Sequence, residues 1–140
     1  MLTPFEKKRR RNMELNKLNY VEEAEKVIQS LVRKDRNGKD VIDLTTSKLR
    51  NLLSMISQIY NTATHETSKT ISEDLQSSVQ YLKMRFAYEA GREKVVKAFV
   101  DKAKIFQHID NIGNSREKLI IFCHYMEALV AYHKYYGGRD

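Results

Sequence analysis

Apolar positions recur at steps of three and four residues along most of the chain, which is the period of an amphipathic α-helix. The first such stretch runs from about Leu15 to Arg33. Its apolar positions share one face: Leu18, Val21, Ala24, Ile28, Leu31 and Val32. The stretch stops at the polar run of residues 35–40, whose Asn37-Gly38 pair is typical of a turn. The pattern therefore predicts one helix followed by a turn.

A second helix is predicted from the hydroxyl-rich segment Thr45-Thr46-Ser47. Such side chains can accept hydrogen bonds from the free backbone N–H groups of a first helical turn. The buried face that follows consists of Leu49, Leu52, Leu53, Ile56 and Tyr60. The Thr- and Ser-rich segment 61–70 then predicts a loop.

The third helix is predicted to start at Ser72, with acidic residues in its first turn that suit the positive end of the helix dipole. Its core positions are Leu75, Val79, Leu82, Phe86 and Ala90. Beyond Gly91 the apolar positions shift by about 100° around the helical wheel. Because a straight helix cannot bury both faces against one neighbour, we expect a break between Gly91 and Lys94. A fourth helix then ends at residues 111–114.

A fifth helix is predicted from the capping residue Ser115 to about Tyr136. Gly137 follows it, at the position where a left-handed C-cap is favoured. The core side of this helix consists of Leu119, Phe122, Cys123, Met126, Leu129, Val130 and His133.

The composition supports a fold made of long helices. The 140 residues include five glycines and one proline, whereas strand-rich folds need many turns that use these residues. The sequence therefore predicts an all-α protein, a compact bundle of about five helices. Residues 15–140 would form this single domain, behind a basic and flexible tail at residues 1–14.

The net charge of +7 is uneven along the chain. Five consecutive cations, Lys7 to Arg11, stand against Glu6 in the tail and leave only a mildly basic body. Such a tail suits phosphate backbones or anionic membrane surfaces, but it is equally typical of a solvated terminus. No apolar run of about 18 residues and no signal-peptide pattern are present, so we expect a cytoplasmic protein without a membrane partner.

Catalytic chemistry is not expected. The four histidines show no metal-binding spacing, and no Gly-rich phosphate loop is present. The single cysteine, Cys123, lies on an apolar face and suits a buried, inert thiol. Small helical RNases place a histidine shortly after an arginine, whereas Arg116 and His124 have seven residues between them. We therefore expect no catalytic residue, no metal ligand and no cofactor.

Two groups of basic residues suit phosphate binding. Tyr81, Arg85, Tyr88 and Arg92 form one stripe off the core face of the third helix. Arginine grips phosphates and tyrosine stacks on sugars or bases, although the stripe could also be a second packing face. Lys48 and Arg50 begin the second helix, where cations oppose the dipole but lie beside N–H groups that favour anions. An ordinary solvated first turn is the alternative.

The fifth helix carries Tyr125, Tyr132 and Tyr136 beside its core face. Tyrosine is enriched in interface hot spots, so this flank is a candidate subunit interface. The alternative is that the helix is central and buried on most sides.

Three segments resemble the small helical subunit of the type III-A CRISPR effector, the Csm complex. They are residues 44–54 (LTTSKLRNLLS), 88–93 (YEAGRE) and 125–140 (YMEALVAYHKYYGGRD). The resemblance covers the chain from about Tyr20 onward, and the basic tail lies outside it.

The resemblance implies a non-catalytic helical bundle that stacks head to tail in several copies. The expected partners are the target RNA, the CRISPR guide RNA, copies of itself, the guide-holding backbone subunit and the polymerase-like large subunit. Such a filament would line the guide–target channel and contact the target backbone without reading its sequence. A stand-alone nucleic-acid-binding bundle and a small helical RNase remain the alternatives.

The resemblance implies RNA contact only for basic residues inside the matching segments. These are Lys48, Arg50, Arg92, Lys134 and Arg139, to which the stripe adds Arg85. The predicted RNA contacts are therefore these six residues, and the predicted subunit interface is the tyrosine flank.

Overall fold

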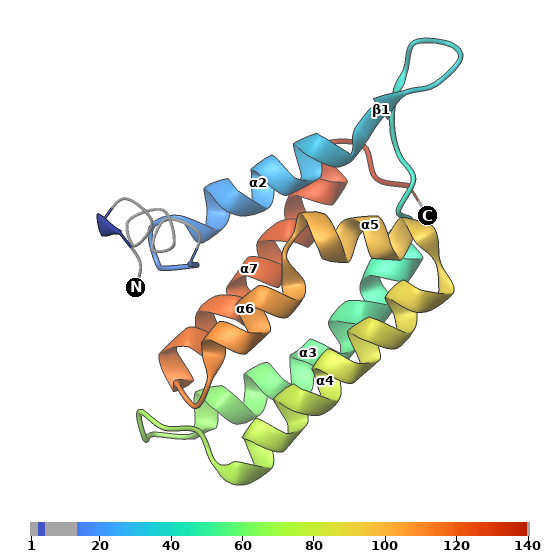
Figure 1. The fold of residues 1–140 in the computed structure, drawn as a ribbon. Coiled ribbons are helices and arrows are strands. Elements are labelled where there is room, and N and C mark those ends of the chain that lie inside the picture. The colour runs from blue at the N-terminus through green and yellow to red at the C-terminus, as the bar shows by residue number, and fades with distance from the viewer. Residues whose placement is uncertain (1–2, 5–13, 140) are drawn as a thin grey trace.

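The computed structural model describes residues 3–4 and 14–139. Its helices are α2 (Tyr20–Leu31), α3 (Thr46–His65), α4 (Glu73–Arg92), α5 (Lys94–Lys102), α6 (Ile105–Ile112) and α7 (Arg116–Tyr135). Strands β1 (Val32–Lys34) and β2 (Asp40–Ile42) pair antiparallel. Helix α7 packs against α2, α3 and α6, and α4 packs against α3 and α5 (Figure 1). The predicted all-α fold is confirmed, with one short hairpin added. Most of the predicted tail lies outside the described residues.

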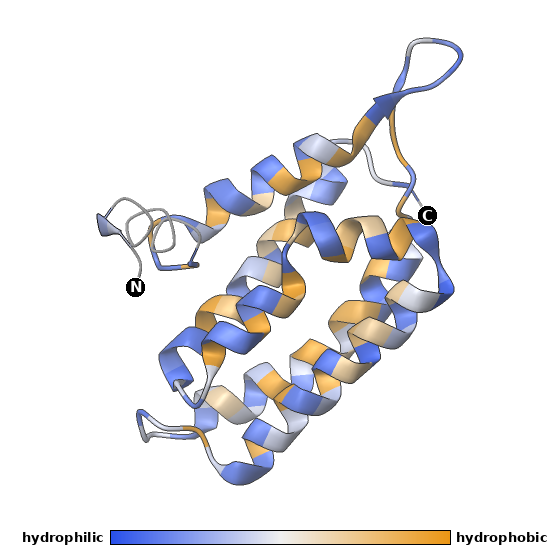
Figure 2. Cartoon of the chain, in the orientation of Figure 1, coloured by the Kyte–Doolittle hydropathy of each residue, from blue (hydrophilic) through white to orange (hydrophobic). Residues whose placement is uncertain are grey.

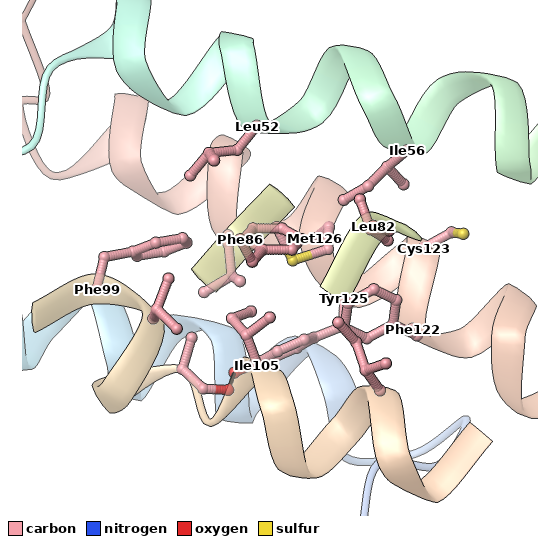
Figure 3. Close-up of a cluster of buried hydrophobic side chains, with 14 of the residues drawn as sticks. Leu52, Ile56, Leu82, Phe86, Phe99, Ile105, Phe122, Cys123, Tyr125 and Met126 are labelled. Atoms are coloured by element: carbon pink, nitrogen blue, oxygen red, sulfur yellow. Dashed lines mark hydrogen bonds between the residues drawn. The ribbon is translucent and has the colours of Figure 1, made fainter. Parts of the chain in front are cut away.

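The core lies between α7 and the helices around it. Figure 2 shows the apolar positions of the helices turned toward the inside of the bundle. Phe122 and Met126 of α7 meet Phe86 of α4, Phe99 of α5 and Ile105 of α6 (Figure 3), and all five are almost completely buried. Each such side chain contributes about 1.5–3 kcal/mol through burial. Packing against α7 therefore holds the other helices together.

The first helix is shorter than the apolar pattern predicts. It begins at Tyr20 because the side-chain oxygen of Asn16 accepts hydrogen bonds from the backbone N–H groups of Leu18 and Asn19. These bonds offer the backbone an alternative to the helix. After Leu31 the chain turns into β1, which pairs with β2 in the register Val32↔Ile42. The predicted turn at residues 35–40 is confirmed, but it closes a β-hairpin.

The predicted loop at residues 61–70 is wrong over its first half, because α3 continues to His65. Thr62 and Thr64 donate their hydroxyls to the carbonyls of Gln58 and Asn61, one turn back along the helix. Ala63 of the same segment is fully buried. Internal hydrogen bonding and one buried contact thus outweigh the weak helix propensity of threonine.

Helix capping follows the sequence closely. The hydroxyls of Thr45, Ser72 and Ser115 accept hydrogen bonds from the backbone N–H groups three residues later and cap α3, α4 and α7. The break expected between Gly91 and Lys94 is confirmed at Glu93, which has extended backbone angles (φ −138°, ψ 124°).

The predicted fourth helix is in fact two helices, α5 and α6. They are divided at Lys104, which has a left-handed conformation (φ 54°) that is uncommon for residues other than glycine. The buried hydroxyl of Tyr125 donates a 2.9 Å hydrogen bond to the carbonyl of Ala103 beside this break. That bond satisfies a carbonyl that the interrupted helix leaves without a partner.

His108 makes the stability of the fold dependent on pH. The imidazole is buried, lies edge-on to the Tyr125 ring at 5.1 Å between centroids, and has its pKa lowered to about 4 by burial and by nearby Lys104. The unfolded chain therefore takes up a proton near pH 6.5, whereas the folded chain does so only near pH 4. The free energy of unfolding should be highest above pH 6.5 and should fall by about 2–3 kcal/mol as the pH is lowered from 6.5 to 4.

Urea unfolding at pH 7 and pH 4.5 would measure this loss. In the His108→Gln variant, which has no imidazole to protonate, the difference between the two pH values should shrink. An equal difference in both proteins would contradict the role of His108.

Candidate nucleic-acid interface

The start of α3, the ends of α4 and α7, and the β-hairpin lie at one end of the bundle (Figure 1). The backbone N–H of Thr46, at the start of α3, donates a 2.8 Å hydrogen bond to the carbonyl of Arg139, beyond α7. Lys48 forms an ion pair with Glu93 at the end of α4. Five of the six predicted RNA contacts lie at this basic end, in the helix termini or next to them: Lys48, Arg50, Arg92, Lys134 and Arg139. Arg85 lies about two turns before the end of α4.

The C-terminal turn after α7 holds this end together. Gly137 has φ 99°, as predicted for a left-handed cap. The N–H of Gly138 donates to the carbonyl of His133 (2.7 Å) and that of Gly137 to the carbonyl of Lys134 (3.2 Å). A methyl group on the buried Gly138 would overlap the ring of His133, so only glycine fits there. The turn thereby directs Arg139 back onto α3.

Lys48 and Arg50 do not share a face of α3, because two residues correspond to about 200° around a helix. Lys48 is half-buried and pairs with Glu93, which offsets its unfavourable position in the first turn. Arg50 is exposed and forms no ion pair with any described residue. The two residues therefore offer separate contacts.

The predicted stripe on α4 is a free surface of the chain. Tyr81 and Tyr88 are 60% and 55% exposed, so they do not pack against another helix of the same bundle. The guanidinium carbons of Arg85 and Arg92 each lie 5.6 Å from the centre of the Tyr88 ring. Glu89 pairs with both arginines, at 3.5 and 3.7 Å. Arg85, Tyr88 and Arg92 thus form an ordered arginine–tyrosine array on a solvent-exposed face.

The three tyrosines of the α7 flank lie in different environments. Tyr125 is 1% exposed and belongs to the core, so its prediction as a surface interface residue is wrong in this conformation. Its neighbours α5 and α6 cover it, which periodicity on α7 alone cannot reveal. Tyr132 and Tyr136 are half-buried, and the Tyr136 hydroxyl donates to Glu25 of α2 (2.7 Å). The sequence reasoning missed Tyr135, which is 76% exposed between them.

The catalytic candidates of the sequence are metal ligands, the Cys123 thiol and Arg116. Within residues 3–4 and 14–139, no three His, Cys, Asp or Glu side chains gather as a metal ion would require. Burial raises the pKa of the Cys123 thiol to about 12, which keeps it protonated and unreactive at neutral pH. Arg116 donates a 2.7 Å hydrogen bond to the carbonyl of Ala63 at the end of α3, a structural role.

Fold and surface together define a small, predominantly α-helical protein with a basic end and an exposed arginine–tyrosine array. The family model described as Csm2 Type III-A matches residues 19–139. The chain therefore belongs to the Csm2 family, the small subunit of the type III-A CRISPR complex, and the resemblance seen in the sequence is confirmed.

Individual relatives agree with the family model. The chain is 45% identical over 122 residues to the CRISPR system Cms protein Csm2 of Mycobacterium tuberculosis (strain CDC 1551 / Oshkosh) and to that of Streptococcus thermophilus. Each match covers 87% of this chain and 94% of the relative. The Csm2 of Enterococcus italicus is 40% identical over 134 residues, covering 91% and 94%. Separately, no helix of the described part is long and apolar enough to cross a membrane.

Gly138→Ala should destabilise the protein by about 1–3 kcal/mol, because the added methyl group must displace the buried His133 ring. Thermal unfolding would measure the change. Gly91→Ala is the control, since a methyl group on that exposed helical residue meets no atom within 4 Å and should be neutral or stabilising. Equal melting temperatures for the two variants would refute the packing role of Gly138.

Proposed function

We propose that the chain is a non-catalytic, cytoplasmic subunit that stacks in several copies and lines the channel in which guide RNA and target RNA pair. In this role it contacts the target RNA backbone and leaves sequence recognition to base pairing. Membership of the Csm2 family supports a place in the type III-A CRISPR complex. The observation that carries the RNA contact is the arginine–tyrosine array, in which Tyr88 and Arg92 are exposed and Arg85 is half-buried.

The chemistry of the array suits a sugar–phosphate backbone. Guanidinium groups bind phosphate oxygens with two parallel hydrogen bonds, and such contacts position a strand without reading its bases. Tyr88 restrains both guanidinium groups from one side, and its exposed ring can stack on a sugar or base. The half-exposed pairs with Glu89 are worth at most about 1 kcal/mol each, so a phosphate can replace them at low cost.

Lys48, Arg50, Lys134 and Arg139 extend the same basic surface around the end of the bundle. Lys134, Arg139 and Arg50 are exposed, and none forms an ion pair with another described residue. Weak contacts of this kind gain strength by repetition along a filament, because the copies bind one strand together. We propose that these residues contact the RNA alongside the array.

Head-to-tail stacking requires two unlike surfaces on each copy. We propose that the α7 end formed by Tyr132, Tyr135 and Tyr136 supplies one of them. The Tyr135 ring stands edge-on to that of Tyr136 at 5.0 Å and offers the large exposed aromatic area that interfaces favour. The guide-holding backbone subunit and the polymerase-like large subunit are the other protein partners of this proposal.

The RNA contact predicts a specific loss in Arg85→Gln with Arg92→Gln. Target RNA retention by the reconstituted complex should weaken, and the slope of log affinity against log salt should fall by about one to two. Lys102→Gln with Lys118→Gln is the control, because it removes the same charge from exposed residues that form no ion pair within the described chain. Equal slopes for the two double variants would exclude the array as an RNA contact.

The stacking surface predicts that Tyr132→Ala lowers the number of copies of this subunit in the purified complex. Native mass spectrometry would count the copies. Tyr132→Phe retains the ring and should assemble normally, and Tyr81→Ala removes an exposed tyrosine from another helix. If a folded Tyr132→Ala variant assembles with the full copy number, the α7 end is not the stacking surface.

A further inference from the structure

The β-hairpin projects from the bundle beside the basic end (Figure 1). Its base is anchored, because Val41 and Ile42 of β2 are 3% and 6% exposed. Its tip, residues 36–39, is exposed. No role in the proposed function has been given to this segment so far.

Ion pairs lie along the hairpin, and hydrogen bonds order its turn. Arg33 and Asp43 form a bidentate pair with contacts of 2.8 and 3.0 Å, and Lys34 pairs with Asp40 at 2.6 Å. At the turn, one carboxylate oxygen of Asp35 accepts hydrogen bonds from the backbone N–H groups of Asn37 and Lys39, both at 2.9 Å. These bonds also lower the pKa of Asp35.

The cations of the hairpin fall into two groups. Arg33 and Lys34, nearer the base, are neutralised by aspartates. Arg36 and Lys39 at the tip are exposed and form no ion pair with any residue the structure describes. Asp35 and Asp40 flank the tip, but the first accepts two turn amides and the second pairs with Lys34. The tip therefore presents two exposed cations on an ordered turn.

The location of the hairpin relates it to the basic end. Strand β2 leads into α3 through residues 43–45, and the N–H of Thr46 at the start of α3 donates to the carbonyl of Arg139, so the base of the hairpin lies beside the basic end (Figure 1). A strand that runs from the basic end along the hairpin would reach the tip. Because the hairpin extends beyond the helices, it lengthens the surface that can contact phosphate groups.

We propose that the hairpin tip is a further phosphate-binding site, at which Arg36 and Lys39 contact the backbone of the RNA held by the basic end. This inference rests on the proposed function. An RNA partner fits the tip better than a protein surface does. Protein hot spots need large aromatic or apolar anchors, whereas the large exposed apolar side chains of the described chain all lie on or just before the helices. Two cations without such an anchor suit a polyanion.

The first test removes the tip charges within the reconstituted complex. Arg36→Gln with Lys39→Gln should weaken binding of a guide-complementary RNA by roughly fivefold and lower the salt slope by about one to two. The control pair Lys102→Gln with Lys118→Gln removes the same charge elsewhere. If both double variants bind with equal affinity and equal slope, the tip does not contact RNA.

The second test concerns the rigidity of the tip at constant charge. Asp35→Asn and Asp35→Ala remove the same negative charge, but only asparagine keeps an oxygen that can accept the turn amides. The alanine variant should bind the RNA more weakly than the asparagine variant. Equal affinities would overturn the positioning role of the turn.

Three further outcomes separate this inference from the proposed function. A tip variant that lowers the copy number of the subunit but leaves the salt slope unchanged would identify a protein contact and overturn the inference. If the Arg85 and Arg92 variant loses RNA while the tip variant does not, only the inference fails. If neither variant differs from the control pair, the proposed RNA contact fails as well.

Discussion

The basic end of the molecule depends on a single buried hydrogen bond, from His133 to the carbonyl of Leu44. It is 2.7 Å long and joins α7 to the connection between β2 and α3. Because a carbonyl can only accept, the Nε2 atom of His133 must carry the proton. The Gly138 turn covers the same ring, and the next residue accepts the N–H of Thr46. Leaving either buried group without its partner would cost about 1–3 kcal/mol, so the helix ends are joined firmly.

The charged surface around this junction is stabilised by weaker interactions than the junction itself. The cations of the basic end are either unpaired or engaged in half-exposed ion pairs, such as those of Arg85 and Arg92 with Glu89. Pairs of this kind contribute little to stability and exchange readily with water and ions. The buried contacts thus fix the positions of the helix ends, while the charges on them remain available to an external anion.

Local rules predicted much of this fold from the sequence, and non-local contacts account for the errors. Caps at Thr45 and Ser115 and the break at Glu93 depend on nearby residues, and so does the α4 stripe, whose members lie one or two turns apart. The hairpin was missed because strands of three residues are too short to show a period. Tyr125 was misplaced because the helices that cover it are distant in sequence. The convergence of Lys48 and Arg139 depends likewise on a junction that no local pattern contains.

The array on α4 and the hairpin tip, the two proposed phosphate contacts, are ordered in different ways. The array is ordered by side-chain contacts on a helix, whereas the backbone of the tip is ordered by hydrogen bonds to Asp35. Order of this kind before a ligand arrives reduces the entropy lost on binding. In the proposed role, the phosphate contacts would be insensitive to base identity. Affinity would then grow with the number of separated contacts, and the projecting hairpin would add one beyond the helices (Figure 1).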